Sequence, residues 1–564
     1  MPDWFYRTVA QRALFCLPDE AGRAVALGVI GTLGKSAPGR AVIEFMGHMA
    51  PEPRLAVTVA GTRYASPIGL GWRVDPECRA SAGLACFGVG CLEATDANRR
   101  QVRREAGETL EDGLVHPEPP QVGTIRLPVL KRHWDLNGHE WLRLPDGTNL
   151  PVLAWDHATE TERPGVVLQV GMHNADGGWS VPAKMPATLP EKVRAWRTAL
   201  PEGAPLIVAG GIGSPGDAVA LVQAGADLLL VDAGMVYRGP GLVKRCNEAL
   251  LARLPAPPEA AVGLFRRAWF WTAILGAAMG VGGAATLALS LTRVLLPYDE
   301  HYLGLTAPVL ERTMPTLFAF MAHDRATLAG VMLGLGWLYW CLGRGGIRAG
   351  RHGAQTAVTA SALVGFASFF AFFGFGYFDT LHAFVAVVLL QFTVQIMVSV
   401  PGGGEHPPVP ADEEDAAWRR AQWGQLLWVV HAVGLLFAGG LILGIGMTSV
   451  FVAEDLGFLC MTAEQVQALG ERLMGVVAHD RATLGGMLLA TGTAMLLPVL
   501  WCFRRGEAWL WRAMAGLGLP AYVAAIGIHY HVGYTDWRHL VPAWIGLGLW
   551  VAGLGLSRGY LRAR

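Results

Sequence analysis

The sequence has no excess of either charge. Its 564 residues include 45 Lys and Arg and 45 Asp and Glu, a formal net charge of +0 at pH 7. Without a basic surplus there is no electrostatic footprint for a phosphate backbone, so we expect no nucleic acid partner. Charged residues are few, at 16%, and hydrophobic residues reach 52%, whereas soluble domains carry about 25% charged residues. A purely soluble protein is therefore not expected.

The sequence also lacks the cysteine patterns that are typical of redox or metal-binding sites. The eight cysteines form no CxxC pair, and no Cys/His cluster has the spacing of zinc or iron–sulfur ligands. We therefore predict neither a zinc or iron–sulfur site of cysteine and histidine ligands nor a disulfide framework. We expect no signal peptide in the first 20 residues, because Asp3, Arg7 and Arg12 interrupt every apolar run.

A short helix at this end would place five residues on one face. They are Trp4, Phe5, Val9, Ala13 and Cys16. Such a face suits a membrane surface, and it suits packing on the following domain equally well.

Charge thins sharply after Arg267, where eight apolar runs begin. Each is long enough to span a bilayer, for which about 20 helical residues are needed. They lie near 268–296, 316–342, 355–376, 380–400, 424–452, 474–502, 508–530 and 538–557. Because backbone groups in lipid must be satisfied within their own segment, we predict transmembrane helices and a lipid bilayer as partner.

Arginines gather on one side of these spans. With eight spans, the following residues all face the same side: Arg266, Arg267, Arg344, Arg348, Arg351, Arg504, Arg505, Arg512, Arg558, Arg562 and Arg564. The positive-inside rule makes that side cytoplasmic. We expect an integral protein of a bacterial inner membrane, with its front half and its C-terminus in the cytoplasm.

The membrane half contains an internal duplication. The segment 322–328, AHDRATL, recurs at 478–484 with an offset of 156 residues, and GYFDTLH at 376–382 resembles GYTDWRH at 533–539 with an offset of 157. Four spans per copy give the copies the same orientation, which predicts two parallel four-helix repeats.

The two motifs supply the polar residues of these spans. The candidate site residues are His323, Asp324, Arg325, Asp379, His382, His479, Asp480, Arg481, Asp536 and His539. One interpretation is a polar site for haem, quinone, metal or a transported solute. The other is a structural clamp that holds the second and third spans of each repeat, since charges in a membrane are expensive unless paired. His529 occurs in the second copy only, which argues against a symmetric metal site.

The front half alternates short apolar runs with Gly-rich turns and helical runs. The strands expected at 205–209 and 227–231 precede helices at 217–224 and 242–251, a pattern typical of a parallel α/β fold. A Gly-Gly turn one βα unit before a second small-residue turn predicts a phosphate site of a (β/α)8 barrel. The candidate cofactor-binding residues are Gly210, Gly211, Ala233 and Gly234. The alternative is a retained fold whose ligand has been lost.

These motifs resemble the dihydroorotate dehydrogenases of the membrane-associated, quinone-using class. The last two barrel units of that class carry IxGxGGI, AGA and GxxxxGP, and this chain has 207–212 (IVAGGI), 224–226 (AGA) and 234–240 (GMVYRGP). The likeness covers about residues 1–97 and 165–252. It implies FMN as cofactor, a quinone as electron acceptor and a place in pyrimidine metabolism.

The chain lacks the residues that carry out the reaction in that class. Where the class has AAGxDK, residues 71–76 are GWRVDP and lack the lysine, and Trp155 stands in place of a second lysine. The segment with the serine base has no counterpart, so no catalytic residue is predicted. By length, one or two barrel units look missing between 97 and 161.

We therefore expect a TIM-barrel-like, truncated α/β domain joined to an all-α polytopic membrane domain. The predicted boundaries are 1–50 for an N-terminal helical extension, 51–255 for the barrel, 263–400 for repeat 1, 401–422 for a linker and 423–564 for repeat 2. The first functional hypothesis is a membrane-anchored, FMN-dependent oxidoreductase that passes electrons toward a membrane quinone. The second is a catalytically inactive barrel that acts as a cytoplasmic sensor of a small-molecule ligand for a membrane transporter or channel. In a third, the barrel is an appendage and the activity lies at the membrane motifs.

Overall fold

The computed structural model describes residues 3–95, 127–134, 139–160, 163–173, 179–180, 185–255, 261–351, 353–370, 377, 380–401 and 414–563. The chain divides into two compact units. Unit 1 comprises Met1–Pro255 and Pro407–Trp418, and unit 2 comprises Ala256–His406 and Arg419–Arg564.

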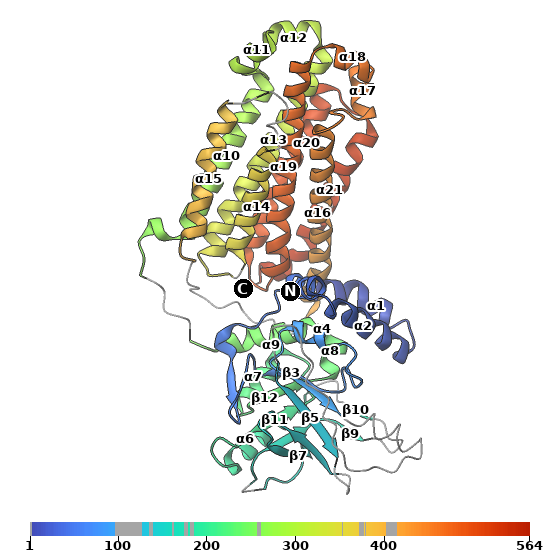
Figure 1. The fold of residues 1–564 in the computed structure, drawn as a ribbon, viewed down its shortest axis with the longest axis vertical. Helices are drawn as coiled ribbons and strands as arrows, with labels where there is room; N and C mark the ends of the chain where they lie inside the picture. The colour runs from blue at the N-terminus through green and yellow to red at the C-terminus, as the bar shows by residue number, and fades with distance from the viewer. Residues whose placement is uncertain are drawn as a thin grey trace. The chain divides into compact units, whose positions relative to one another are not determined.

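Unit 1 contains a closed barrel of eight strands in the order β11-β12-β3-β4-β5-β6-β7-β8. Figure 1 labels β3, β5, β7, β11 and β12 of this barrel. The strands are β3 (Ile68–Leu70), β4 (Leu92–Thr95), β5 (Val129–Trp134), β6 (Glu140–Arg143), β7 (Asn149–Ala154), β8 (Val166–Gln169), β11 (Leu206–Ala209) and β12 (Leu228–Val231). The predicted TIM-barrel-like fold is confirmed, and the strands expected at 205–209 and 227–231 are β11 and β12.

The middle of the barrel differs from a regular (β/α)8 arrangement, in which eight parallel strands each precede a helix. In this barrel of described strands, β6 pairs antiparallel with both β5 and β7, and the other neighbouring pairs are parallel. An antiparallel connection needs only a few residues, whereas a parallel crossover needs a dozen or more. Two hairpins therefore close the circle of eight strands within the segment where βα units looked missing.

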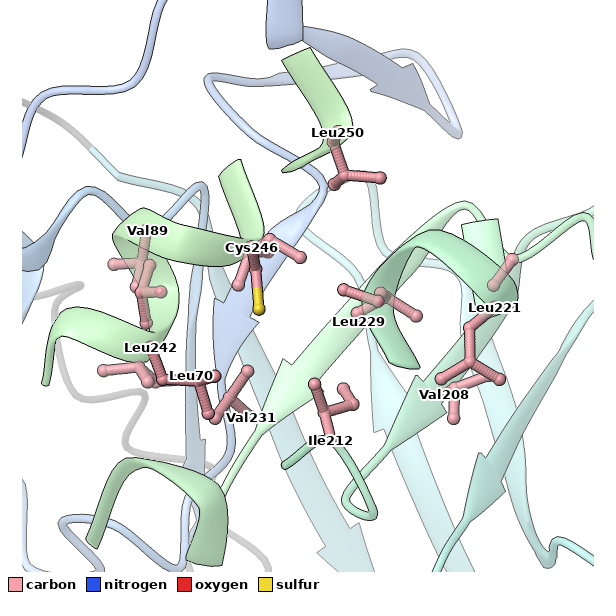
Figure 2. Packing of buried hydrophobic residues seen from close by; sticks show 14 of the residues in the cluster. Leu70, Val89, Val208, Ile212, Leu221, Leu229, Val231, Leu242, Cys246 and Leu250 are labelled. Atoms are coloured by element: carbon pink, nitrogen blue, oxygen red, sulfur yellow. The ribbon is translucent and has the colours of Figure 1, made fainter. Parts of the chain in front are cut away.

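The strands β3, β11 and β12 are apolar on both faces, as expected of strands covered by helices. Ile207, Leu228 and Leu230 belong to one buried cluster, inside the barrel. The residues that alternate with them along β11 and β12 belong to a second cluster, the outer core between the strands and the helices. Figure 2 shows this outer core, where Leu70, Val208, Leu229 and Val231 lie among Leu221, Leu242, Cys246 and Leu250 of the covering helices.

The other elements of unit 1 precede, close and cover the barrel. They are η1 (Tyr6–Ala10), α1 (Gln11–Leu14), α2 (Asp19–Gly34), α3 (Ala37–Gly47), η2 (Pro53–Leu55), β1 (Val57–Val59), β2 (Thr62–Tyr64), α4 (Ser81–Leu84), η3 (Ala85–Phe87), β9 (Met172–His173), β10 (Trp179–Ser180), α6 (Leu189–Ala199), α7 (Pro215–Gln223), α8 (Ala233–Arg238) and α9 (Gly241–Leu251). At the start of the chain Trp4 is buried, whereas Phe5 and Val9 are exposed. The membrane-surface face expected there stays a prediction.

Unit 2 is helical. Its elements are η4 (Leu264–Arg266), α10 (Ala268–Thr292), α11 (Pro297–Leu303), α12 (Ala307–Thr313), α13 (Pro315–Cys341), η5 (Leu342–Ile347), α14 (Ala354–Phe370), α15 (Thr380–Val398), α16 (Ala416–Gly446, which begins in unit 1), α17 (Ala453–Leu459), α18 (Ala463–Ala468), α19 (Glu471–Trp501), α20 (Ala508–Val532) and α21 (Trp537–Leu561). Seven helices of the described part are long and apolar enough to cross a membrane: α10, α13 with η5, α15, α16, α19, α20 and α21. The third predicted span corresponds to α14, whose described part has 17 residues. The chain therefore has the helices of an integral membrane protein.

Candidate functional site

The Gly-Gly turn after β11 is held in a conformation that requires glycine. Gly210 and Gly211 have φ angles of +83° and +74°, a region that side chains strongly disfavour. A Cβ on Gly211 would lie 2.7 Å from Cγ1 of Val170, and one on Gly210 would lie 2.8 Å from Oδ2 of Asp232. Both glycines are thus explained by the packing of the turn against the chain itself.

The N-terminus of α7, which follows this turn, already holds an anion. Oδ2 of Asp217 accepts hydrogen bonds from the backbone N–H groups of Gly213 and Ser214, both at 2.9 Å. The Ser214 hydroxyl in turn accepts from the N–H of Asp217 at 3.1 Å, which completes a capping box. A helix N-terminus attracts phosphate because its N–H groups are unsatisfied. Here Asp217 satisfies the N–H of the N-cap residue Ser214 and the N–H of Gly213, which precedes the helix.

In the second turn, after β12, a carboxylate also accepts a backbone N–H. Asp232 follows β12, is buried, and accepts the N–H of Ala233 through Oδ1 at 2.6 Å. Burial raises the pKa of Asp232, while the Arg73 guanidinium, 3.3 Å away, lowers it. A Cβ on Gly234 would lie 2.1 Å from the carbonyl oxygen of Ile212, so the two turns abut.

Further charges are buried where β3, β4 and β5 end. Glu93 of β4 accepts the N–H of Trp72 at 3.1 Å and an N–H of Arg132 from β5. Arg132 also contacts Glu140 at 3.1 Å, and its side chain is 0% exposed. Gly71 joins this group to Asp232, since its Cβ position lies within 3.5 Å of both the Asp232 and Glu93 side chains.

The predicted FMN does not fit the described residues of this end of the barrel. A flavin phosphate carries negative charge, and the turns expected to bind it hold the carboxylates of Asp217 and Asp232. The predicted residues Gly210, Gly211, Ala233 and Gly234 do lie together at these turns. Sequence patterns missed Glu93 and Arg132, although a charge inside an apolar strand, as in Leu92-Glu93-Ala94, is a usable signal of a buried ion pair.

The membrane motifs meet in a reciprocal set of ion pairs in unit 2. Arg325 of α13 contacts Asp480 of α19 at 2.7 Å, and Arg481 of α19 contacts Asp324 of α13 at 3.3 Å. The predicted clamp therefore has different partners from those expected, because the pairs join the second spans of the two copies. They do not join the second and third spans of one copy.

Each of these arginines has a second carboxylate that no motif indicated. Arg325 contacts Asp299 of α11 at 2.9 Å, and Arg481 contacts Asp455 of α17 at 2.6 Å. The hydroxyls of Tyr377 and Tyr534 donate to Asp299 and Asp455, respectively. The offsets of 156 and 157 residues also relate these additional residues, which is the sequence signal that identifies them.

The histidines lie beside these pairs. Nδ1 of His323 lies 3.0 Å from Asp324, and Nδ1 of His479 lies 3.2 Å from Asp480. His479 also contacts His382 of α15, with Nε2 to Nδ1 at 3.1 Å. The other two motif aspartates are Asp379 and Asp536. Asp379 lies outside the described residues, and Asp536 caps α21 by accepting the N–H groups of residues 538 and 539.

Comparison with known proteins relates one segment of the chain to dihydroorotate dehydrogenases. No model of a known protein family matches the chain. The chain is 41% identical over 95 residues to the dihydroorotate dehydrogenase (quinone) of Flavobacterium lutescens, covering 16% of this chain and 27% of that protein. It is 48% identical over 71 residues to that of Xanthomonas campestris pv. campestris (strain B100), and 47% over 70 residues to that of Stenotrophomonas maltophilia (strain K279a). These two matches cover 13% and 12% of this chain and 20% of each relative. The chain thus spans about a quarter or less of the relatives' length, and over that segment it is similar to the quinone-using dihydroorotate dehydrogenases.

Proposed function

We propose that the chain is an integral membrane protein whose dihydroorotate-dehydrogenase-like barrel no longer performs flavin chemistry and serves as a regulatory, ligand-sensing domain of the polytopic unit. The observation that carries this proposal is the presence of Asp217 and Asp232 on the N–H groups of the two turns expected to bind a flavin phosphate. In this proposal the barrel and the C-terminus are cytoplasmic, in a bacterial inner membrane.

A clamp within unit 1 supports a regulatory role. The carboxylate of Glu414, just before α16, contacts Arg7 at 2.8 Å, Arg238 at 3.0 Å and Arg245 at 3.1 Å. Trp418, in the first turn of α16, lies under the guanidinium groups of Arg7 and Arg245 and is 1% exposed. These contacts hold residues 414–418, which lead into α16, against unit 1. In this proposal a conformational change in the barrel is transmitted to α16 through these residues.

In this proposal the ligand is a small molecule that binds at these turns, where the side chains of Asp232 and Arg73 meet. A ligand that binds one arrangement of this ion pair better than another gives the barrel two states that the ligand can select.

A second candidate is favoured by the sequence identity of 41–50% to quinone-using dihydroorotate dehydrogenases. In it the chain is an FMN-dependent oxidoreductase that passes electrons toward a membrane quinone. This candidate requires the two turns to exchange their carboxylates for a flavin phosphate.

Titration of the detergent-purified full chain with FMN, followed by flavin fluorescence, tests the proposal. We expect the wild type not to bind FMN at micromolar concentration. We expect Asp232→Ser to bind it at least about tenfold more tightly, because a carboxylate beside a phosphate is removed. Asp227→Ser is the matched control, since Asp227 directly precedes the same strand, β12, and also pairs with an arginine, Arg197, at 3.1 Å. Tight, stoichiometric binding to the wild type would contradict the proposal and would favour the oxidoreductase instead.

A further inference from the structure

We propose that His323, His529 and His539 bind one first-row divalent transition-metal ion, for which zinc is the best fit, through their Nε2 atoms. The three residues come from α13, α20 and α21, and the ligand atoms that they offer all lie within 4.8 Å of one another. His323 and His529 are buried, and His539 is partly buried. This proposal concerns unit 2 alone and does not rest on the role of the barrel.

Hydrogen bonds fix the ring protons of the first two histidines. Nδ1 of His323 lies 3.0 Å from Oδ1 of Asp324, and Nδ1 of His529 lies 2.5 Å from the carbonyl oxygen of Ala525. Carboxylate and carbonyl oxygens only accept hydrogen bonds, so each Nδ1 must donate. Because a neutral imidazole carries one ring proton, both Nε2 atoms then present lone pairs.

His539 follows the same rule through Tyr534. The tyrosine hydroxyl donates its single proton to Oδ1 of Asp455 at 2.8 Å. Nδ1 of His539 lies 3.2 Å from the same hydroxyl oxygen, and it must therefore donate to it. Nε2 of His539 is then the third lone pair of the group.

The spacing of these lone pairs calls for a cation. Nε2 of His323 and Nε2 of His529 lie only 3.0 Å apart, where two lone pairs repel. In a tetrahedral zinc site with Zn–N bonds of about 2.0–2.1 Å, the nitrogen atoms are roughly 3.4 Å apart. Imidazole nitrogens suit zinc and its neighbours among the transition metals. Three histidines also leave a fourth position open, as in catalytic zinc sites.

The surroundings match those of known metal ligands. A ligating histidine usually donates its second ring N–H to a carboxylate, a carbonyl or another oxygen, which orients the ring. Here Asp324, the carbonyl of Ala525 and the Tyr534 hydroxyl fill these three places. Asp324 is in turn paired with Arg481 at 3.3 Å, so the outer shell is itself held in position.

The other copy of the repeat provides a natural comparison. There His479 contacts His382, and these residues correspond to His323 and His539. The offset of 157 residues that relates the second motifs places Phe372 opposite His529. The sequence itself therefore replaces the third ligand with phenylalanine in the first copy, and the proposal predicts a metal in one of the two places only.

Metal binding to the detergent-purified full chain tests this proposal. After treatment with a chelator, the protein is titrated with Zn²⁺ and, for its visible absorption bands, with Co²⁺. We expect one ion per chain and the bands of a four-coordinate Co²⁺. His529→Phe should weaken binding at least about 100-fold, because loss of an outer-shell partner alone costs 10–100-fold. His382→Phe, the same substitution in the other copy, should leave binding unchanged.

A second ligand variant, His539→Gln, keeps the test decisive if His529→Phe does not fold. Gel filtration of the metal-free variants shows whether each of them is folded. Weak binding in both folded variants with full binding in His382→Phe supports the site. If the wild type binds neither ion, a proton shared between His323 and His529 replaces the metal and the proposal fails. Wild-type binding in folded His529→Phe, or equal loss in His382→Phe, also overturns it.

Discussion

Replacing Arg132 with methionine should destabilise the barrel strongly, because it leaves a buried negative charge without its partner. The side chains of Arg132 and Glu93 are 0% and 1% exposed, and the second partner, Glu140, is 15% exposed. Removing one member of a buried ion pair costs about 3–5 kcal/mol. With an m value of about 2 kcal/mol/M for urea, the unfolding midpoint should fall by roughly 1.5–2.5 M.

Pulse proteolysis of the detergent-solubilised full chain in urea, with detection of an N-terminal tag, measures this midpoint. Arg163→Met is the matched control, because Arg163 pairs with Glu160 at the surface and its loss should leave the midpoint unchanged. Adding Glu93→Gln to Arg132→Met should recover at least half of the loss, since the uncompensated charge is removed. A midpoint for Arg132→Met equal to that of Arg163→Met would refute the reasoning.

Two further predictions concern the ion pairs of unit 2 and the orientation of the chain. Arg325→Met should lower the thermal stability of the protein in detergent more than Asp480→Asn, because the first removes the arginine partner of both Asp299 and Asp480, whereas the second leaves Arg325 with Asp299. Equal losses of thermal stability, measured by fluorescence-detected gel filtration after heating, would contradict this. A membrane-impermeant maleimide applied to intact spheroplasts should label the exposed Cys460 but not the exposed Cys16, because the positive-inside rule puts them on opposite sides. Cys460→Ser is the control, and labelling of Cys16 would reverse the proposed orientation.

The sequence predicts the spans well because the membrane imposes a simple rule. A run of about 20 apolar residues has few alternatives to a helix in lipid, and α10, α13, α15, α16, α19, α20 and α21 all lie at predicted positions. The last two barrel strands are equally predictable from their apolar runs and glycine turns. The hairpins of β5, β6 and β7 are not, because their charged residues, such as Lys131 and Arg143, hide the strand pattern.

The site residues are predictable in type but not in partnership. The repeated motifs identify Asp324, Arg325, Asp480 and Arg481, but tertiary packing decides that each arginine pairs across the two copies. His529 could not be assigned a role, because it lies 206 residues from His323 and no local spacing links them. The two turns after β11 and β12 show a different limit of the sequence. Their glycines match the pattern of a phosphate site, but the neighbouring carboxylate of Asp232 changes which ligands the second turn can bind.

An absorption spectrum of the detergent-purified full chain, followed by acid release of any bound chromophore, tests the central claim that the barrel has given up flavin chemistry. Because Asp217 and Asp232 occupy the two turns, we predict no flavin bands and no FMN in the acid supernatant. Flavin bands with one released FMN per chain would contradict the account and would favour the quinone-linked oxidoreductase.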